Sequence, residues 1–167
     1  MAEAARVEPP TTGDERATLT AFLDYHRATL AWKCEGLTGE QLRQRAVPPS
    51  TLSLLGLVRH LAEVERGWFR RGFAGEELGI LYCTDEDPDA DFERVDDAPV
   101  DDAFATWREE CERSRAIVAA APSLDATFGT RSRRSLRWLL CHLIEEYARH
   151  NGHADLLRER LDGATGE

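Results

Sequence analysis

The stretch "LRWLLCHLIEEYARHNGHADLLRER", Leu136–Arg160, decides how the chain folds. Its apolar residues recur every three or four positions, which is the spacing of one face of an α-helix. The pattern predicts a helix from Ser135 to Leu161 that ends at Gly163, because glycine commonly terminates helices. The apolar face consists of Leu136, Leu139, Leu140, Leu143, Tyr147, Leu157 and Leu161.

Polar residues with metal-binding chemistry lie at the margin of this apolar face. At about 100° per residue, His142, Glu146, His150 and His153 fall within an arc of roughly 80°. A carboxylate and an imidazole at positions i and i+4 of a helix can both reach one divalent metal ion. The arc is therefore either part of a metal site or a set of hydrogen-bonded residues at the edge of the core.

Three further segments show helical periodicity: 14–36, 53–72 and 100–121. No segment has a convincing strand pattern. Four long amphipathic helices in one small chain predict an all-α fold, a four-helix bundle. We expect the bundle to occupy residues 14–162, between a disordered N-terminal tail (1–13) and a C-terminal tail (163–167).

The connection between the second and third predicted helices, residues 73–98, is long and strongly acidic. A loop of this length is unusual in a compact domain, where most connections are short. In a four-helix bundle it predicts a crossover connection that runs from one end of the bundle to the other.

Composition narrows the classes of partner. The 167 residues carry a formal net charge of −10, which argues against nucleic-acid binding. The basic segment 131–137 is interpreted as a solvated loop and first helical turn. No apolar run approaches the roughly 20 residues of a membrane span, and no signal peptide is evident, so we expect a cytoplasmic protein. The four cysteines form no CxxC pair, which excludes a zinc ribbon and a thioredoxin-like motif.

The second helical segment adds two candidates for the site. His60 flanks its apolar face, and Glu65 lies within that face. A buried carboxylate must be paired or bound to a metal. We favour a salt bridge between Glu65 and an arginine, because Glu65 and His60 point well apart on the helix. His26, in the first helix, is interpreted as a histidine at the edge of the core.

The large aromatic residues Trp68, Phe69, Trp107 and Trp138 leave two interpretations open. They exceed what a small bundle obviously needs, and aromatic residues are enriched at protein interfaces. Some are therefore expected at a dimer interface; alternatively, all four fill the core.

Two blocks of the sequence, "LSLLGLVRHLAEVERGWF" (residues 52–69) and the opening stretch, resemble the DinB superfamily. Its members carry a histidine in the second helix and "HxxxHRGQ…LR" in the last. His60 matches the first histidine, His150 matches the second histidine of the motif, and Glu146 replaces the first. The mycothiol-dependent maleylpyruvate isomerases are similar in having Glu-x-x-x-His at this point. His153 stands where many relatives have glutamine, and is either a further ligand or a neighbour of the site.

The resemblance implies a crossover four-helix bundle, commonly a homodimer, that binds a divalent metal, zinc or nickel, through His60, Glu146 and His150. It also implies a low-molecular-weight thiol as cosubstrate and a small-molecule substrate. The expected activity is a mycothiol-type S-transferase or isomerase. Two alternatives remain open: a metal-dependent hydrolase with Glu145 or His142 as base, and a non-catalytic, stress-related dimeric binding module with a degenerate metal site.

Overall fold

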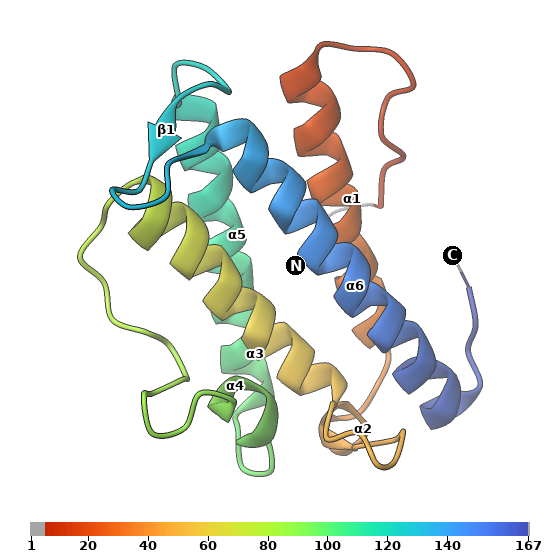
Figure 1. The fold of residues 1–167 in the computed structure, drawn as a ribbon. Helices are drawn as coiled ribbons and strands as arrows, with labels where there is room; N and C mark the ends of the chain where they lie inside the picture. The colour runs from red at the N-terminus through yellow and green to blue at the C-terminus, as the bar shows by residue number, and fades with distance from the viewer. Residues whose placement is uncertain (1–5, 167) are drawn as a thin grey trace.

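The structure is a computed structural model that describes residues 6–166. Four long helices form an all-α bundle, as predicted (Figure 1). They are α1 (Glu15–Cys34), α3 (Leu54–Glu65), α5 (Val100–Ala120) and α6 (Leu136–Asp162), with α3 continued by the π-helical segment η1 (Arg66–Phe73). The shorter elements are α2 (Gly39–Arg43), α4 (Ala90–Glu93), β1 (Thr127–Phe128) and β2 (Arg134–Ser135).

The predicted crossover is confirmed by the course of the chain. Helix α1 packs on α6, and α3 packs on α5. Figure 1 shows α3 and α5 running in the same direction, so the connection between η1 and α5 must return along the length of the bundle. The short helix α4 lies in this connection and packs against α3. This contact brings the crossover next to the candidate site.

Local signals in the sequence explain where the long helices begin and end. The hydroxyl of Ser135 accepts a hydrogen bond from the backbone N–H of Trp138 at 3.1 Å and caps α6. Ser53 caps α3 in the same way, through the N–H of Gly56. Gly163 ends α6 with a φ of 76°, a left-handed conformation that glycine adopts without steric cost.

The apolar face predicted for α6 forms the centre of the core. Leu136, Leu139, Leu140, Leu143 and Tyr147 are completely buried. Each buried leucine contributes on the order of 2 kcal/mol of transfer free energy, which makes this face a main source of bundle stability.

The four large aromatic residues divide between core and surface. Phe69 and Trp107 are buried, Trp68 is half-buried, and Trp138 is 42% exposed. The core therefore takes up only two of them. The homodimer implied by the resemblance stays a prediction.

Two local features were not predicted. The segment before α6 contains a small antiparallel pairing, in which Thr127 lies opposite Ser135 and Phe128 opposite Arg134. The second helix was expected to be regular to residue 72, but η1 is π-helical; the N–H of Ala74, for example, bonds to the carbonyl oxygen of Phe69 at 2.8 Å. Pairings of two residues and changes of helical winding leave little trace in apolar periodicity.

Both ends of the described chain lie against the bundle. Residues 6–13 form neither helix nor strand, and Arg6 stacks on Tyr25 and Trp32. At the other end, the Lys33 ammonium donates to the carbonyl oxygen of Gly166 at 2.7 Å. Residues 1–5 of the tail expected to be disordered, and residue 167, lie outside the described residues. Within residues 6–166, no helix is long and apolar enough to cross a membrane.

Candidate metal centre

Three of the predicted ligands meet between α3 and α6. Potential ligand atoms of His60, Glu146 and His150 all lie within 4.8 Å of one another. The Nε2 atom of His150 is 3.6 Å from a carboxylate oxygen of Glu146, and the His60 and His150 ring centroids are 4.7 Å apart. Glu146 and His150 are four residues apart, so they lie one turn apart on α6. His60 lies on α3, which packs against α6.

Asp91, from the short helix α4, fixes the orientation of His60. Its carboxylate lies 2.8 Å from His60 Nδ1 and is 3% exposed. An ionised carboxylate can only accept hydrogen bonds, so the hydrogen of a neutral His60 ring resides on Nδ1. This leaves Nε2 with a free lone pair. Carboxylate–histidine pairs of this kind orient metal ligands in many metalloproteins.

Phe92 covers the same imidazole. Its ring stacks on His60 with centroids 4.3 Å apart and an angle of 24° between the planes. The other carboxylate oxygen of Asp91 accepts the backbone N–H of Phe92 at 2.8 Å. The crossover connection thus fixes His60 by a hydrogen bond and by a packed ring.

His150 is held in the neutral form that a metal ligand needs. Burial, with added repulsion from the neighbouring His60 and His153, lowers the pKa of His150 to about 3. A lowered pKa means that protons compete for this imidazole only well below neutral pH. Its ring is therefore unprotonated at physiological pH and can donate a lone pair.

The donor set fits a divalent transition metal. Two imidazole nitrogens and one carboxylate oxygen are the ligands of many catalytic zinc sites, which keep a further position open. In a tetrahedral site, ligand atoms about 2.0–2.2 Å from the ion are about 3.3–3.6 Å apart, so atoms that now lie within 4.8 Å of one another would have to move closer by rotation of the side chains. Nickel accepts the same imidazole and carboxylate donors.

A comparison with protein families agrees with this geometry. The family model described as mycothiol-S-transferase matches residues 18–163, which includes all three residues of the group. The chain belongs to the mycothiol S-transferase family. This membership confirms the resemblance to the DinB superfamily. A search of curated proteins finds no match.

The other histidines of this family member lie outside the group of three. His153 contacts the ring nitrogen of His150 that does not face Glu146. The Nδ1 atoms of the two histidines are 3.3 Å apart. Nε2 of His142 is 3.7 Å from Glu146, on the side of that carboxylate away from His150. His26 lies at the α1–α6 contact, where its carbonyl oxygen accepts from Asn151 at 3.0 Å. His153 and His142 therefore contact members of the group without belonging to it, and a role for His153 as a further ligand stays a prediction.

Glu65 forms the salt bridge that the sequence favoured. Its carboxylate is completely buried and accepts two N–H groups of Arg27, each at 2.8 Å. It also accepts the hydroxyl of Tyr147 at 2.8 Å, and Tyr147 accepts the indole N–H of Trp107. This network joins α1, α3, α5 and α6 in the core of the bundle.

Asp91 is the residue that the sequence analysis missed. It lies in the acidic connection among Asp85, Glu86, Asp87 and Asp89. Nothing in the local pattern distinguishes it from these neighbours. Its role depends on the return of the crossover along α3, which periodicity does not specify.

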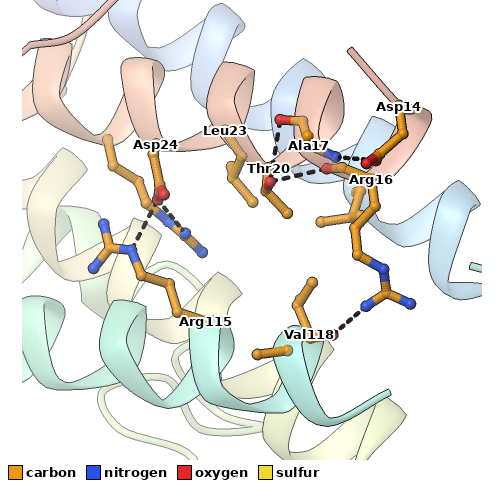
Figure 2. Close-up of a pocket in the computed structure, with 11 residues that line it drawn as sticks. Asp14, Arg16, Ala17, Thr20, Leu23, Asp24, Arg115 and Val118 are labelled. Carbon is orange, nitrogen blue, oxygen red and sulfur yellow. Dashed lines mark hydrogen bonds and ion pairs between the residues drawn. The ribbon is translucent and has the colours of Figure 1, made fainter. Parts of the chain in front are cut away.

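A cavity of about 390 Å³ lies elsewhere, between α1 and α5. Figure 2 shows that charged groups along its wall are paired with each other or with backbone N–H and carbonyl groups. Asp24 bridges Arg27 and Arg115, and Arg16 donates to the carbonyl oxygen of Val118. None of the residues that line it belongs to the group of three, and we assign it no ligand.

Removal of the Asp91 charge is expected to weaken metal binding. In Asp91→Asn, His60 keeps a hydrogen-bond partner but loses the carboxylate that orients its ring. Loss of such outer-shell partners lowers metal affinity by about 10- to 100-fold. Competition titration with a chromophoric chelator measures the change. Asp89→Asn, an exposed position in the same turn, is the matched control; equal affinities of the two variants would contradict the role of Asp91.

Proposed function

We propose that this chain is a divalent-metal-dependent S-transferase that joins the thiol of mycothiol to a small electrophile. One observation carries the proposal: the His60 imidazole, oriented by Asp91, the His150 imidazole, whose lowered pKa keeps it neutral at physiological pH, and the Glu146 carboxylate converge in a chain of the mycothiol S-transferase family. Zinc and nickel are the metals that the donor set favours.

The chemistry needs a thiolate at neutral pH. A divalent cation held by His60, Glu146 and His150 supplies the positive charge that favours loss of the thiol proton. In the transfer, the sulfur forms a bond to the electrophilic carbon, the leaving group departs with its electron pair, and the thiol proton goes to solvent. The contribution of Asp91 and Phe92 is to hold His60 in place, so that the site need not reorganise during turnover.

Two of the four cysteines of the chain, Cys83 and Cys111, are poorly suited to act as the nucleophile. Burial raises the pKa of the Cys83 thiol, and burial together with the Glu65 carboxylate raises the pKa of Cys111. A raised pKa lowers the fraction of reactive thiolate at neutral pH. These two cysteines are therefore poor nucleophiles, which agrees with a thiol that enters as cosubstrate.

The hydrolase alternative would require a base that activates water. The two residues considered for that role lie beside the site: the Glu145 side chain is 65% exposed, and His142 stacks on Trp138. The family match favours thiol transfer over hydrolysis. The binding-module alternative predicts metal binding, at most, without turnover.

A comparison of thiols tests the proposed function. The zinc-loaded protein is incubated with an alkyl halide and with mycothiol, with cysteine or without thiol, and products are identified by mass spectrometry. We expect the thioether of mycothiol to form at least tenfold faster than in the protein-free control, with little acceleration for cysteine. Thiol-independent loss of the halide would support the hydrolase, and an absence of both products would support the binding module. The cytoplasmic location expected from the sequence stays a prediction.

A further inference from the structure

An aromatic surface adjoins the candidate metal centre. It consists of Trp68 from η1 with Trp138 and His142 from α6, here called the tryptophan–histidine cluster. Trp138 stacks on His142 with centroids 4.9 Å apart and planes 16° apart. Trp68 contacts both, with centroid distances of 5.5 Å to Trp138 and 4.6 Å to His142. The three rings form one continuous aromatic cluster.

The cluster leads directly to the group of three. Trp138, His142, Glu146 and His150 follow one another at intervals of four residues, so they share a face of α6. Each interval corresponds to about 6 Å along the helix. His142 Nε2 is 3.7 Å from a carboxylate oxygen of Glu146, and 42% of Trp138 is exposed. A molecule that packs on Trp138 therefore has its other end within reach of the candidate metal centre.

Positive charge is concentrated at the outer end of the cluster. The Arg134 guanidinium lies 5.0 Å from the Trp138 ring and 5.4 Å from the Trp68 ring. Within residues 6–166, the structure pairs Arg134 with no carboxylate; it donates to the carbonyl oxygen of Ser132. Residues 126–144 contain four arginines and no acidic residue, in a chain with a net charge of −10; of the four, Arg137 is ion-paired with Glu15 and Asp125. Arg131 and Arg133 lie in the turn between β1 and β2, and Arg134 lies in β2. Figure 1 shows this hairpin close to the start of α6.

We propose that the tryptophan–histidine cluster and Arg134 bind the electrophilic substrate, and that this substrate is a planar aromatic or conjugated molecule with an anionic group. This inference rests on the proposed function. The rings favour a planar apolar body, because stacked aromatic contacts add to the free energy of burial. Arg134 favours a carboxylate or similar anion at the end of the molecule away from the metal. The electrophilic carbon then lies toward Glu146.

Two probes that differ only in charge test the substrate class: 4-(chloromethyl)benzoate and its neutral methyl ester. In both, the sulfur of mycothiol forms a bond to the benzylic carbon, chloride leaves with the bonding electrons, and the thiol proton is released to solvent. The zinc-loaded protein is expected to show a kcat/KM for the benzoate about tenfold above that for the ester, after subtraction of the uncatalysed rates. A charge-assisted hydrogen bond is large enough to give this ratio.

Arg134→Gln should remove the preference. We expect about a tenfold fall in kcat/KM for the benzoate, through KM, and less than a twofold change for the ester. Arg133→Gln, which removes the neighbouring positive charge, is the matched control and should leave the preference intact. Trp138→Ala should lower kcat/KM for both probes, and Trp138→Phe should restore most of it, because phenylalanine keeps an aromatic surface.

Binding of the unreactive 4-methylbenzoate, measured by saturation-transfer NMR, tests the subsite without turnover. Loss of binding in Arg134→Gln but not in Arg133→Gln would uphold the inference, even if neither chloride reacts and the proposed function fails. Equal binding in all three proteins would overturn it. Sedimentation of the unmodified protein and of Trp138→Ala is the final check. If the substitution converts a dimer to a monomer and 4-methylbenzoate does not bind the unmodified protein, the cluster is an interface between two copies of the chain. That result would also overturn the inference.

Discussion

His60→Ala is expected to abolish metal binding at micromolar concentration and, with it, thiol transfer. The variant leaves only Glu146 and His150, both on α6, and removes the single ligand that α3 contributes. The loss of affinity should exceed the about 10- to 100-fold effect of losing an outer-shell partner, because a bond to the metal is itself removed. Calorimetric titration with Zn²⁺ measures the affinity, and inductively coupled plasma analysis measures the metal content of the purified protein.

His26→Ala is the matched control for this experiment. His26 lies at the α1–α6 contact, where Asn151 donates to its backbone carbonyl oxygen at 3.0 Å, which alanine retains, and lies 3.4 Å from its Nδ1, a contact that alanine loses. We therefore expect metal affinity to change by less than threefold in this variant, as for a substitution with no ligand role. If His60→Ala binds Zn²⁺ as tightly as His26→Ala, the three residues do not form the metal site.

Arg27→Met is expected to destabilise the fold by about 3–5 kcal/mol, because it leaves the Glu65 carboxylate buried without its cation. Arg27 is 4% exposed and Glu65 is completely buried. For a chain of this size, such a loss lowers the melting temperature by roughly 6–20 °C. Chemical denaturation followed by circular dichroism measures the free energy of unfolding.

The double variant Arg27→Met/Glu65→Gln separates the buried charge from the loss of packing. Glutamine keeps an acceptor for the Tyr147 hydroxyl but carries no charge. We expect the double variant to be more stable than Arg27→Met alone, because no unpaired charge remains. Effects of the two substitutions that simply add would show that the pair is not coupled.

The fold was largely predictable because its determinants are local. The apolar stripe of α6 is long, regular and bounded by Ser135 and Gly163, both of which act as caps in the structure. The crossover was predictable because the connection of residues 73–98 is long. The π-helical winding of η1 could not be predicted, because it changes the hydrogen-bonding pattern while Phe69 still faces the core.

The candidate site was predictable only in part, for a physical reason. Glu146 and His150 share one helix face, so their proximity follows from helix geometry. The salt bridge of Glu65 followed from the cost of burying a charge, although Arg27 could not be named. Asp91 and Phe92 reach His60 through a chain reversal more than 25 residues downstream, as the numbering shows. Contacts of that kind depend on tertiary structure, which the sequence pattern around Asp91 does not encode.

We expect a metal held by His60, Glu146 and His150 to be required for transfer to mycothiol. Stepwise addition of Zn²⁺ to metal-free protein, while the rate of thioether formation is followed, tests this requirement directly. We expect the rate to rise linearly and to level off at one equivalent of metal per chain, with no rise in His60→Ala. Full activity of the metal-free protein, or stoichiometric metal binding without a change in rate, would contradict the claim.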